Sequence, residues 1–123
     1  MRIERFDPLA GPAALQACHE MFAAGLPGDF PGLPGLSLPS FTGWWACGFG
    51  AEPRETWLAS VAGQPVGCYL LELPDQDNVT TGMVLPLVAP SQRRAGTGRD
   101  LLRHAAGRAA RSGRTMLEGE AWA

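Results

Sequence analysis

The chain has 123 residues, and its 46% of hydrophobic residues suits a single folded domain rather than a disordered protein. The formal net charge is only −2, and no aromatic residue lies among the carboxy-terminal arginines, which argues against a nucleic-acid-binding protein. No apolar stretch is long enough to cross a membrane. We therefore expect neither nucleic acid nor a membrane as partner.

The amino-terminal segment and the cysteines predict a cytoplasmic protein. Residues 1–11 (MRIERFDPLAG) carry charges where a signal peptide would need an apolar core. Cys18, Cys47 and Cys68 are odd in number and lack the spacing of metal ligands. We expect buried free thiols and no bound metal, since a structural disulfide is unusual in that compartment.

The first half of the chain predicts a strand, a helix and a long connection. Met1–Phe6 alternates as a strand does, and a helix is expected from Asp7 or Pro8 to about residue 24. Residues 25–53 are rich in Gly and Pro, with one short helix expected near 40–47. The aromatic side chains of this connection either line a ligand pocket or cap the core; they are Phe30, Phe41, Trp44, Trp45 and Phe49.

The second half predicts three strands, a helix and a last strand, so that the whole order is β-α-loop-β-β-β-α-β. Pro86 lies inside the third of these strands, where it indicates a sheet edge or a break in pairing. Gly113 suits the end of the helix. The predicted elements are strands at Glu55–Ala62, Val66–Leu73 and Val79–Val88, a helix at Thr97–Ser112 and a strand at Arg114–Ala121.

The positive charge is concentrated around the start of this predicted helix. Every basic residue is Arg, and residues 93–123 carry +4 whereas residues 1–92 carry −6. Gly96 and Gly98 flank Thr97 where the helix begins, so the main chain can approach a ligand closely. Free N–H groups of a first helical turn attract anions, and arginines add charge-assisted hydrogen bonds. The pattern predicts a site for a small phosphorylated ligand.

Three phosphate-binding motifs compete for this loop. A P-loop is excluded because it requires Lys, which the chain lacks. A Rossmann loop is an alternative, because Glu118 lies 20 residues beyond Gly98, but Leu101 stands where its third glycine belongs. The third motif is a pyrophosphate loop with the pattern Arg/Gln-x-x-Gly-x-Gly/Ala. Residues 93–98 (RRAGTG) match it.

With Leu87-Val88 before it and Leu101-Leu102 after it, this loop resembles that of the GNAT superfamily of acyl-CoA-dependent N-acyltransferases. The resemblance implies an α/β fold with a mixed, mostly antiparallel sheet flanked by helices. It also implies one acyl-CoA-binding domain over residues 1–123 that lacks the carboxy-terminal part of the fold. The residues implied to bind the coenzyme are Leu87 and Val88 for pantetheine, and Arg93, Arg94, Gly96, Thr97, Gly98 and Arg99 for pyrophosphate.

The catalytic residues are less well indicated. Some members of the superfamily carry a basic carboxylate where this chain has Gly82, and many take a tyrosine proton donor from a segment beyond Ala123. Glu118 and Glu120 share one face of the last predicted strand and are the candidates for deprotonating an amine. The other polar groups are expected to be structural: Tyr69 in the core, His19 and His104 on helices without a partner nearby in sequence, and Arg103, Arg108 and Arg111 on a solvated helix face.

The resemblance implies an N-acetyltransferase (EC 2.3.1.-) that transfers an acetyl group from acetyl-CoA to a small-molecule or peptide amine. The alternative is a non-catalytic CoA-binding or scaffolding module, such as the degenerate half of a tandem GNAT protein. A pocket lined only by Phe41, Trp44 and Trp45 would favour the module. We also expect a homodimer or a further carboxy-terminal segment to complete the sheet.

Overall fold

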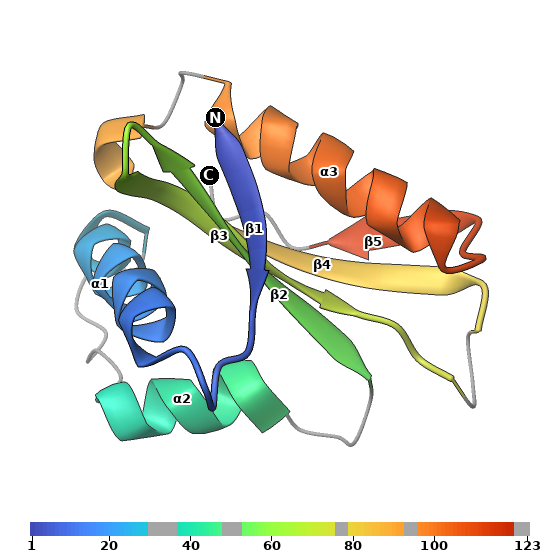
Figure 1. The fold of residues 1–123 in the computed structure, drawn as a ribbon, viewed down its shortest axis with the longest axis horizontal. Helices are drawn as coiled ribbons and strands as arrows, with labels where there is room; N and C mark the ends of the chain where they lie inside the picture. The colour runs from blue at the N-terminus through green and yellow to red at the C-terminus, as the bar shows by residue number, and fades with distance from the viewer. Residues whose placement is uncertain (30–36, 48–52, 76–78, 93–95, 120–123) are drawn as a thin grey trace.

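The computed structural model describes residues 1–29, 37–47, 53–75, 79–92 and 96–119. They form one sheet of five strands in the order β1-β2-β3-β4-β5 (Figure 1). The first four strands pair antiparallel with their neighbours, whereas β5 runs parallel to β4. The strands are β1 (Arg2–Phe6), β2 (Arg54–Val61), β3 (Gln64–Glu72), β4 (Thr81–Val88) and β5 (Met116–Gly119).

Helices cover both faces of the sheet. α1 (Pro12–Asp29) and α2 (Leu38–Cys47) lie on one face, and α3 (Thr97–Arg111) lies on the other (Figure 1). A short 3₁₀ turn, η1 (Pro90–Gln92), follows β4. A mixed, mostly antiparallel sheet between helices confirms the predicted fold class.

β3 is the central strand of the core because both of its faces are covered. Cys68 and Leu70 pack with α1 and α2, whereas Tyr69 and Leu71 pack with α3. Every residue from Val66 to Leu71 is buried. This explains why its sequence is almost continuously apolar rather than alternating.

The β2–β3 hairpin has a tighter turn than predicted. Ala62 and Gly63 have φ angles of 51° and 80°, so both central residues of the turn are left-handed. Two such residues match the right-handed twist of the flanking strands. β3 therefore begins at Gln64, inside the segment that the sequence assigned to the turn.

α1 begins later than the sequence predicted. The backbone N–H of Leu9 donates to the Asp7 carboxylate at 2.9 Å, and that of Gly11 donates to the Asp7 carbonyl at 2.7 Å. These bonds form a turn that ends β1, and Pro12 takes the first helical position, where its missing N–H costs nothing. The helix extends to Asp29, past the predicted end near residue 24.

The described aromatic side chains of α2 cap the core rather than line a pocket. Phe41 and Trp45 have no exposed surface, and their rings stack with centroids 5.3 Å apart. Phe41 also contacts Phe22 of α1, at 5.6 Å between centroids. The side chain of Trp44, like Phe30 and Phe49, lies outside the described residues.

Cys18 and Cys68 are free and fully buried in the core between α1 and β3, which confirms the predicted thiols at these two positions. Burial and the neighbouring Cys18 raise the pKa of the Cys68 thiol well above its ordinary value. Within the described part of the chain, no helix is long and apolar enough to span a membrane.

Candidate functional site

The predicted anion-binding loop ends in an open helix terminus. Gly96 is the N-cap of α3 and adopts the left-handed conformation, with φ 83° and ψ 1°, that favours glycine. The first helical bond runs from the N–H of Asp100 to the Gly96 carbonyl at 3.1 Å, and no side-chain hydrogen bond caps the helix among the described residues. The amides of Thr97, Gly98 and Arg99 therefore have no acceptor within the helix and stand at its positive end.

The Arg99 side chain folds back over this terminus. A Cβ atom on Gly96 would lie 3.7 Å from Nη2 of Arg99, so a guanidinium stands beside the free amides. A Cβ on Gly98 would lie 3.6 Å from the Val88 side chain, which places the first turn of α3 against the end of β4. Of the predicted pyrophosphate residues, four therefore meet at one helix end. Arg93 and Arg94 lie outside the described residues.

Beyond Val84, β4 has an open side. Its described pairing with β5 ends at Val84 and Gly119, and Leu85–Val88 pair with β3 alone among the described residues. The N–H of Ala89 donates to Val66 of β3 at 3.0 Å. Because backbone groups alternate along an antiparallel strand, those of Leu87 face β3 and those of Val88 and Pro86 face the open side.

Pro86 fits this alternation, because its missing N–H lies on the side of β4 that no described strand occupies. Val88 presents both an N–H and a carbonyl there, next to the open end of α3. Leu87 instead contributes a buried side chain to the core that contains α1. The two predicted pantetheine residues thus occupy different environments.

Glu118 lies on the sheet face opposite α3. Gly82 and Leu117 face α3, since a Cβ on Gly82 would lie 3.2 Å from Ala109 and 3.5 Å from Leu117. Glu118 pairs with Met83, so both point to the other face, where Met83 is 46% and Met116 56% exposed. A carboxylate between two exposed methionines could attract an amine with an apolar body. Glu120 lies outside the described residues.

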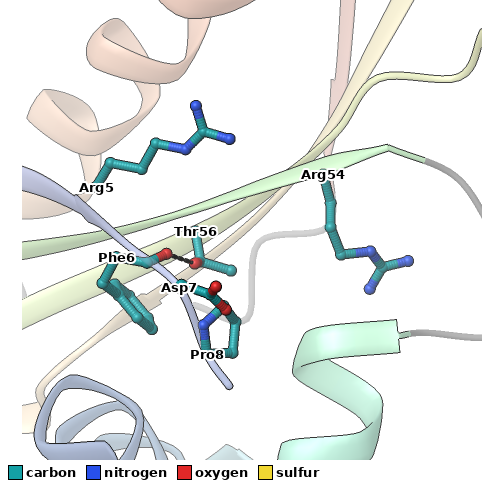
Figure 2. A pocket seen from close by; sticks show the side chains of 6 residues that line it. All are labelled: Arg5, Phe6, Asp7, Pro8, Arg54 and Thr56. Atoms are coloured by element: carbon teal, nitrogen blue, oxygen red, sulfur yellow. Dashed lines mark hydrogen bonds between the residues drawn. The ribbon is translucent and has the colours of Figure 1, made fainter. Parts of the chain in front are cut away.

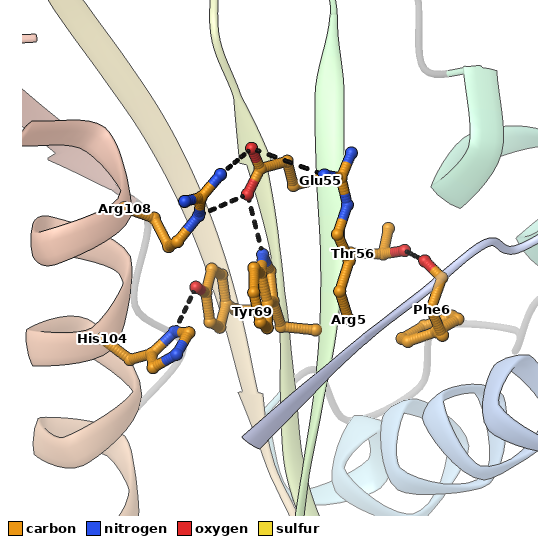
Figure 3. Close-up of polar contacts among 8 residues, drawn as sticks. Arg5, Phe6, Glu55, Thr56, Tyr69, His104 and Arg108 are labelled. Atoms are coloured by element: carbon orange, nitrogen blue, oxygen red, sulfur yellow. Dashed lines mark hydrogen bonds and ion pairs between the residues drawn. The ribbon is translucent and has the colours of Figure 1, made fainter. Parts of the chain in front are cut away.

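Sequence reasoning missed a polar network on the α3 face, shown in Figure 3. Arg108 of α3 donates to both carboxylate oxygens of Glu55 on β2, at 3.0 and 2.7 Å. The Trp57 ring N–H donates to Glu55 at 3.0 Å, and Arg5 of β1 lies 4.0 Å from it. These donors, Arg108 above all, lower the pKa of Glu55, although burial opposes them.

A second pair in this network joins α3 to β3. The Tyr69 hydroxyl lies 2.7 Å from Nδ1 of His104, whose ring packs edge-on against Trp57 at 4.7 Å between centroids. Burial raises the pKa of Tyr69, and burial with the nearby Arg108 and Arg111 lowers the pKa of His104. Tyr69 is thus a core residue, as expected. Arg108 and His104, expected on a solvated face or without a partner, are both partnered.

A hollow of ≈ 520 Å³, whose lining side chains Figure 2 shows, lies where β1 ends and β2 begins. By the strand register this is the opposite end of the sheet from the start of α3. In the wall of this hollow, the Thr56 hydroxyl donates a hydrogen bond to the carbonyl of Phe6. Arg54 there is ion-paired to Glu72 at 3.1 Å. Its lining residues are Arg5, Phe6, Asp7, Pro8, Arg54 and Thr56. The hollow carries both charge signs and is remote from the open helix terminus.

A mixed sheet whose fourth strand leads through a glycine loop into a crossover helix defines an acyltransferase-type α/β fold. The model of the Acetyltransferase (GNAT) family matches residues 15–121, and the chain belongs to that family. No curated protein matches the sequence.

Solved structures share this fold. A tandem GNAT protein from the clavulanic acid biosynthesis pathway superposes with a TM-score of 0.81 at 24% identity, over 96% of this chain but only 35% of its own. An aminoglycoside 6′-N-acetyltransferase complexed with coenzyme A gives 0.67 at 20% identity, over 95% of this chain and 61% of its own. A ribosomal-protein-alanine N-acetyltransferase from Brucella melitensis biovar Abortus 2308 gives 0.64 at 18%, over 98% and 80%. At these identities the likeness establishes the fold alone.

Proposed function

We propose that residues 1–123 form an acyl-CoA-binding unit whose donor is acetyl-CoA. The observation that carries this proposal is the open terminus of α3, with three free amides and the Arg99 guanidinium beside the end of β4. Such a terminus binds phosphate oxygens through N–H groups and the helix dipole. Arg93 and Arg94, which precede it in the loop, add charge for the same pyrophosphate.

The open side of β4 suits the pantetheine arm of the coenzyme. Pantetheine carries two amide groups, and Val88 offers an N–H and a carbonyl on that side. Pro86 offers a carbonyl only. An extended amide-bearing ligand that pairs with Val88 would therefore lie along β4 and point its thioester toward Val84 and Gly119.

We propose an amine with an apolar body as the acceptor, with Glu118 as the residue that takes up its proton. Glu118 lies one position before the last β4–β5 pair, so it is close to where the thioester would arrive. The neutral amine nitrogen attacks the thioester carbon, the C–N bond forms and the C–S bond breaks. The proton lost by the nitrogen passes to Glu118 and from there to the departing sulfur. Glu120, predicted from the sequence to share a face with Glu118, is the second candidate for this role.

A non-catalytic CoA-binding module is the second candidate function. It is favoured by Gly82, which supplies no carboxylate on β4, and by the exposure of Glu118 to solvent. Either function suits a cytoplasmic location, because buried free thiols such as Cys18 and Cys68 persist in a reducing compartment.

Calorimetry with acetyl-CoA, CoA and NAD tests the donor. We expect acetyl-CoA and CoA to bind with similar affinity and NAD not to bind, because NAD lacks the pantetheine arm. Release of free thiol from acetyl-CoA over a panel of amines then separates the enzyme from the module. We expect residues 1–123 to bind the coenzyme but to transfer acetyl groups slowly, because Gly82 leaves β4 without a basic carboxylate. Loss of one acid–base group commonly lowers the rate by about 10²–10⁴-fold. Binding of NAD in place of CoA would favour a dinucleotide site.

A further inference from the structure

α3 is tied to the sheet on one side by two polar contacts. His104 and Arg108 are four residues apart and therefore project from the same side of the helix. Nδ1 of His104 lies 2.7 Å from the Tyr69 hydroxyl on β3, and Arg108 donates two hydrogen bonds to Glu55 on β2 (Figure 3). The Glu55 side chain is only 8% exposed, so the carboxylate of this ion pair is largely shielded from water, whereas the Arg108 side chain is 25% exposed.

The apolar contacts between α3 and the sheet are close, but several of them involve small residues. The buried residues of α3 after Leu101 are Ala105 and Ala109, and Gly82 of the sheet lies opposite Ala109. A Cβ on Gly67 would lie 2.9 Å from Leu101, and one on Gly82 would lie 3.2 Å from Ala109. Small side chains such as these let the helix approach the sheet closely, yet they interlock less than large ones and so offer less resistance to rotation and sliding. The hydrogen bonds of His104 and Arg108 add the resistance to rotation and sliding that these small apolar side chains do not provide.

We propose that His104 and Arg108 are positioning residues, which with Tyr69 and Glu55 set the rotation and slide of α3 and so hold its first-turn amides beside Val88. The effect on coenzyme affinity rests on the proposed function. A helix is a rigid rod that rises about 1.5 Å per residue, so Thr97 lies only about 10 Å from His104. A displacement at His104 is therefore carried to the anion-binding end.

Protonation of His104 alters this arrangement. A neutral ring can accept at Nδ1 the hydrogen bond that the Tyr69 hydroxyl donates, whereas an imidazolium can only donate there, with the hydroxyl oxygen as acceptor. The charges facing the ring are Arg108 and Arg111 on α3 and Glu55 on β2, and Arg5 of β1 lies against Glu55. Burial and the two arginines lower the pKa of His104, and Glu55 alone opposes them. In acid the ring therefore gains a positive charge beside Arg108 and Arg111, and its hydrogen bond with Tyr69 must run from Nδ1 to the hydroxyl oxygen.

Backbone NMR during a pH titration tests the positioning role without any ligand. We expect the amide resonances of Gly98 and Arg99 to shift with the same midpoint as the His104 ring, although neither residue contacts it. The shift disappears in His104→Gln, which keeps a polar side chain but does not titrate, and it shrinks in Tyr69→Phe. Circular dichroism verifies that each variant is folded. If the amide resonances of Gly98 and Arg99 in the wild type do not shift as His104 titrates, the proposal is overturned.

CoA affinity provides a second test of the positioning role. Arg108→Gln and Arg103→Gln each remove one positive charge from the same helix, but Arg103 is exposed and serves as the matched control. A positioning role predicts that Arg108→Gln weakens CoA by about fivefold or more and Arg103→Gln by less. Equal losses would mean that Arg108 acts only through its charge, and would overturn the positioning role. If the wild type does not bind CoA, the proposed function fails, and the ligand-free titration still decides the role of His104.

Discussion

Arg108 near the end of α3 and Glu55 near the start of β2 are 53 residues apart in sequence, yet they form a two-bond ion pair with a 2.7 Å contact. The pair spans the helix–sheet interface and places a carboxylate that is only 8% exposed under a guanidinium. Its geometry makes Glu55 depend on Arg108, because without it the buried carboxylate keeps only the Trp57 N–H bond and the 4.0 Å contact with Arg5 to offset its lost hydration.

Replacing Arg108 with Ala should therefore destabilise the fold by about 2–3 kcal/mol, less than for a fully buried pair because Arg108 is partly exposed. Arg111→Ala removes the same charge from an exposed position of the same helix and should change stability by no more than about 0.5 kcal/mol. Urea unfolding followed by circular dichroism measures both. A loss at Arg111 as large as that at Arg108 would contradict the importance of the ion pair.

Glu55 should also make stability depend on pH in the acid range. Arg108 lowers its pKa below the ordinary value of 4.5, so its contribution is complete above pH 4.5 and is lost as the pH falls through the folded value. Unfolding free energies between about pH 7 and pH 3 should fall less steeply for Glu55→Gln than for the wild type. Glu4→Gln, at an exposed position, is the control and should keep the wild-type slope. Parallel curves for all three proteins would refute the prediction.

The anion-binding terminus predicts that the same substitution at two glycines of α3 affects CoA binding differently. Gly98→Glu places a carboxylate among the free amides and should abolish CoA binding by bulk and by repulsion of phosphate. Gly107→Glu adds the same charge where a side chain meets nothing within 4 Å, and it should bind nearly as the parent does. Calorimetry with CoA compares them. Unchanged affinity in Gly98→Glu would remove the α3 terminus from the proposed site.

The close packing of β4 against β5 at Gly119 predicts a stability effect of substitution there. A Cβ there would lie 2.8 Å from Val84 Cγ1 and 2.9 Å from the Val84 carbonyl oxygen, so Gly119→Ala must push the two strands apart. We expect a loss of about 1–3 kcal/mol, as for other overpacked sites. Gly107→Ala, in open space on a helix, should instead stabilise the protein by up to about 1 kcal/mol. Thermal unfolding of the two variants should shift in opposite directions.

Glu118 gives a kinetic prediction for the proposed reaction. Glu118→Gln keeps the size of the side chain but cannot take a proton, so any amine-dependent thiol release should fall by about 10²-fold or more. CoA affinity should stay the same, because Glu118 lies on the face opposite α3. Met83→Ala should instead raise the KM for an apolar amine more than it lowers kcat. Equal turnover in Glu118→Gln would transfer the role to another residue, with Glu120 the first to examine.

The sequence by itself was sufficient for the local elements around the site. The helical spacing of Leu101, Ala105 and Ala109 predicted α3, and the glycines at 96 and 98 predicted its open start. The strands of the β2–β3 hairpin followed from short runs of apolar and β-branched residues. Each of these features depends on neighbours within one turn or one strand, so the chemistry that specifies it is contiguous in the chain.

Only the tertiary structure decided which distant groups meet. Tyr69 and His104 are 35 residues apart, and nothing local to either indicates the other. Their contact requires the β2–β3–β4 register and the placement of α3 across it. The register likewise decides that Val88 rather than Leu87 presents its backbone to the open side of β4, because a shift of one residue would exchange their roles. Periodicity along a chain predicts which face a residue takes, whereas its partner on that face depends on how separate elements pack.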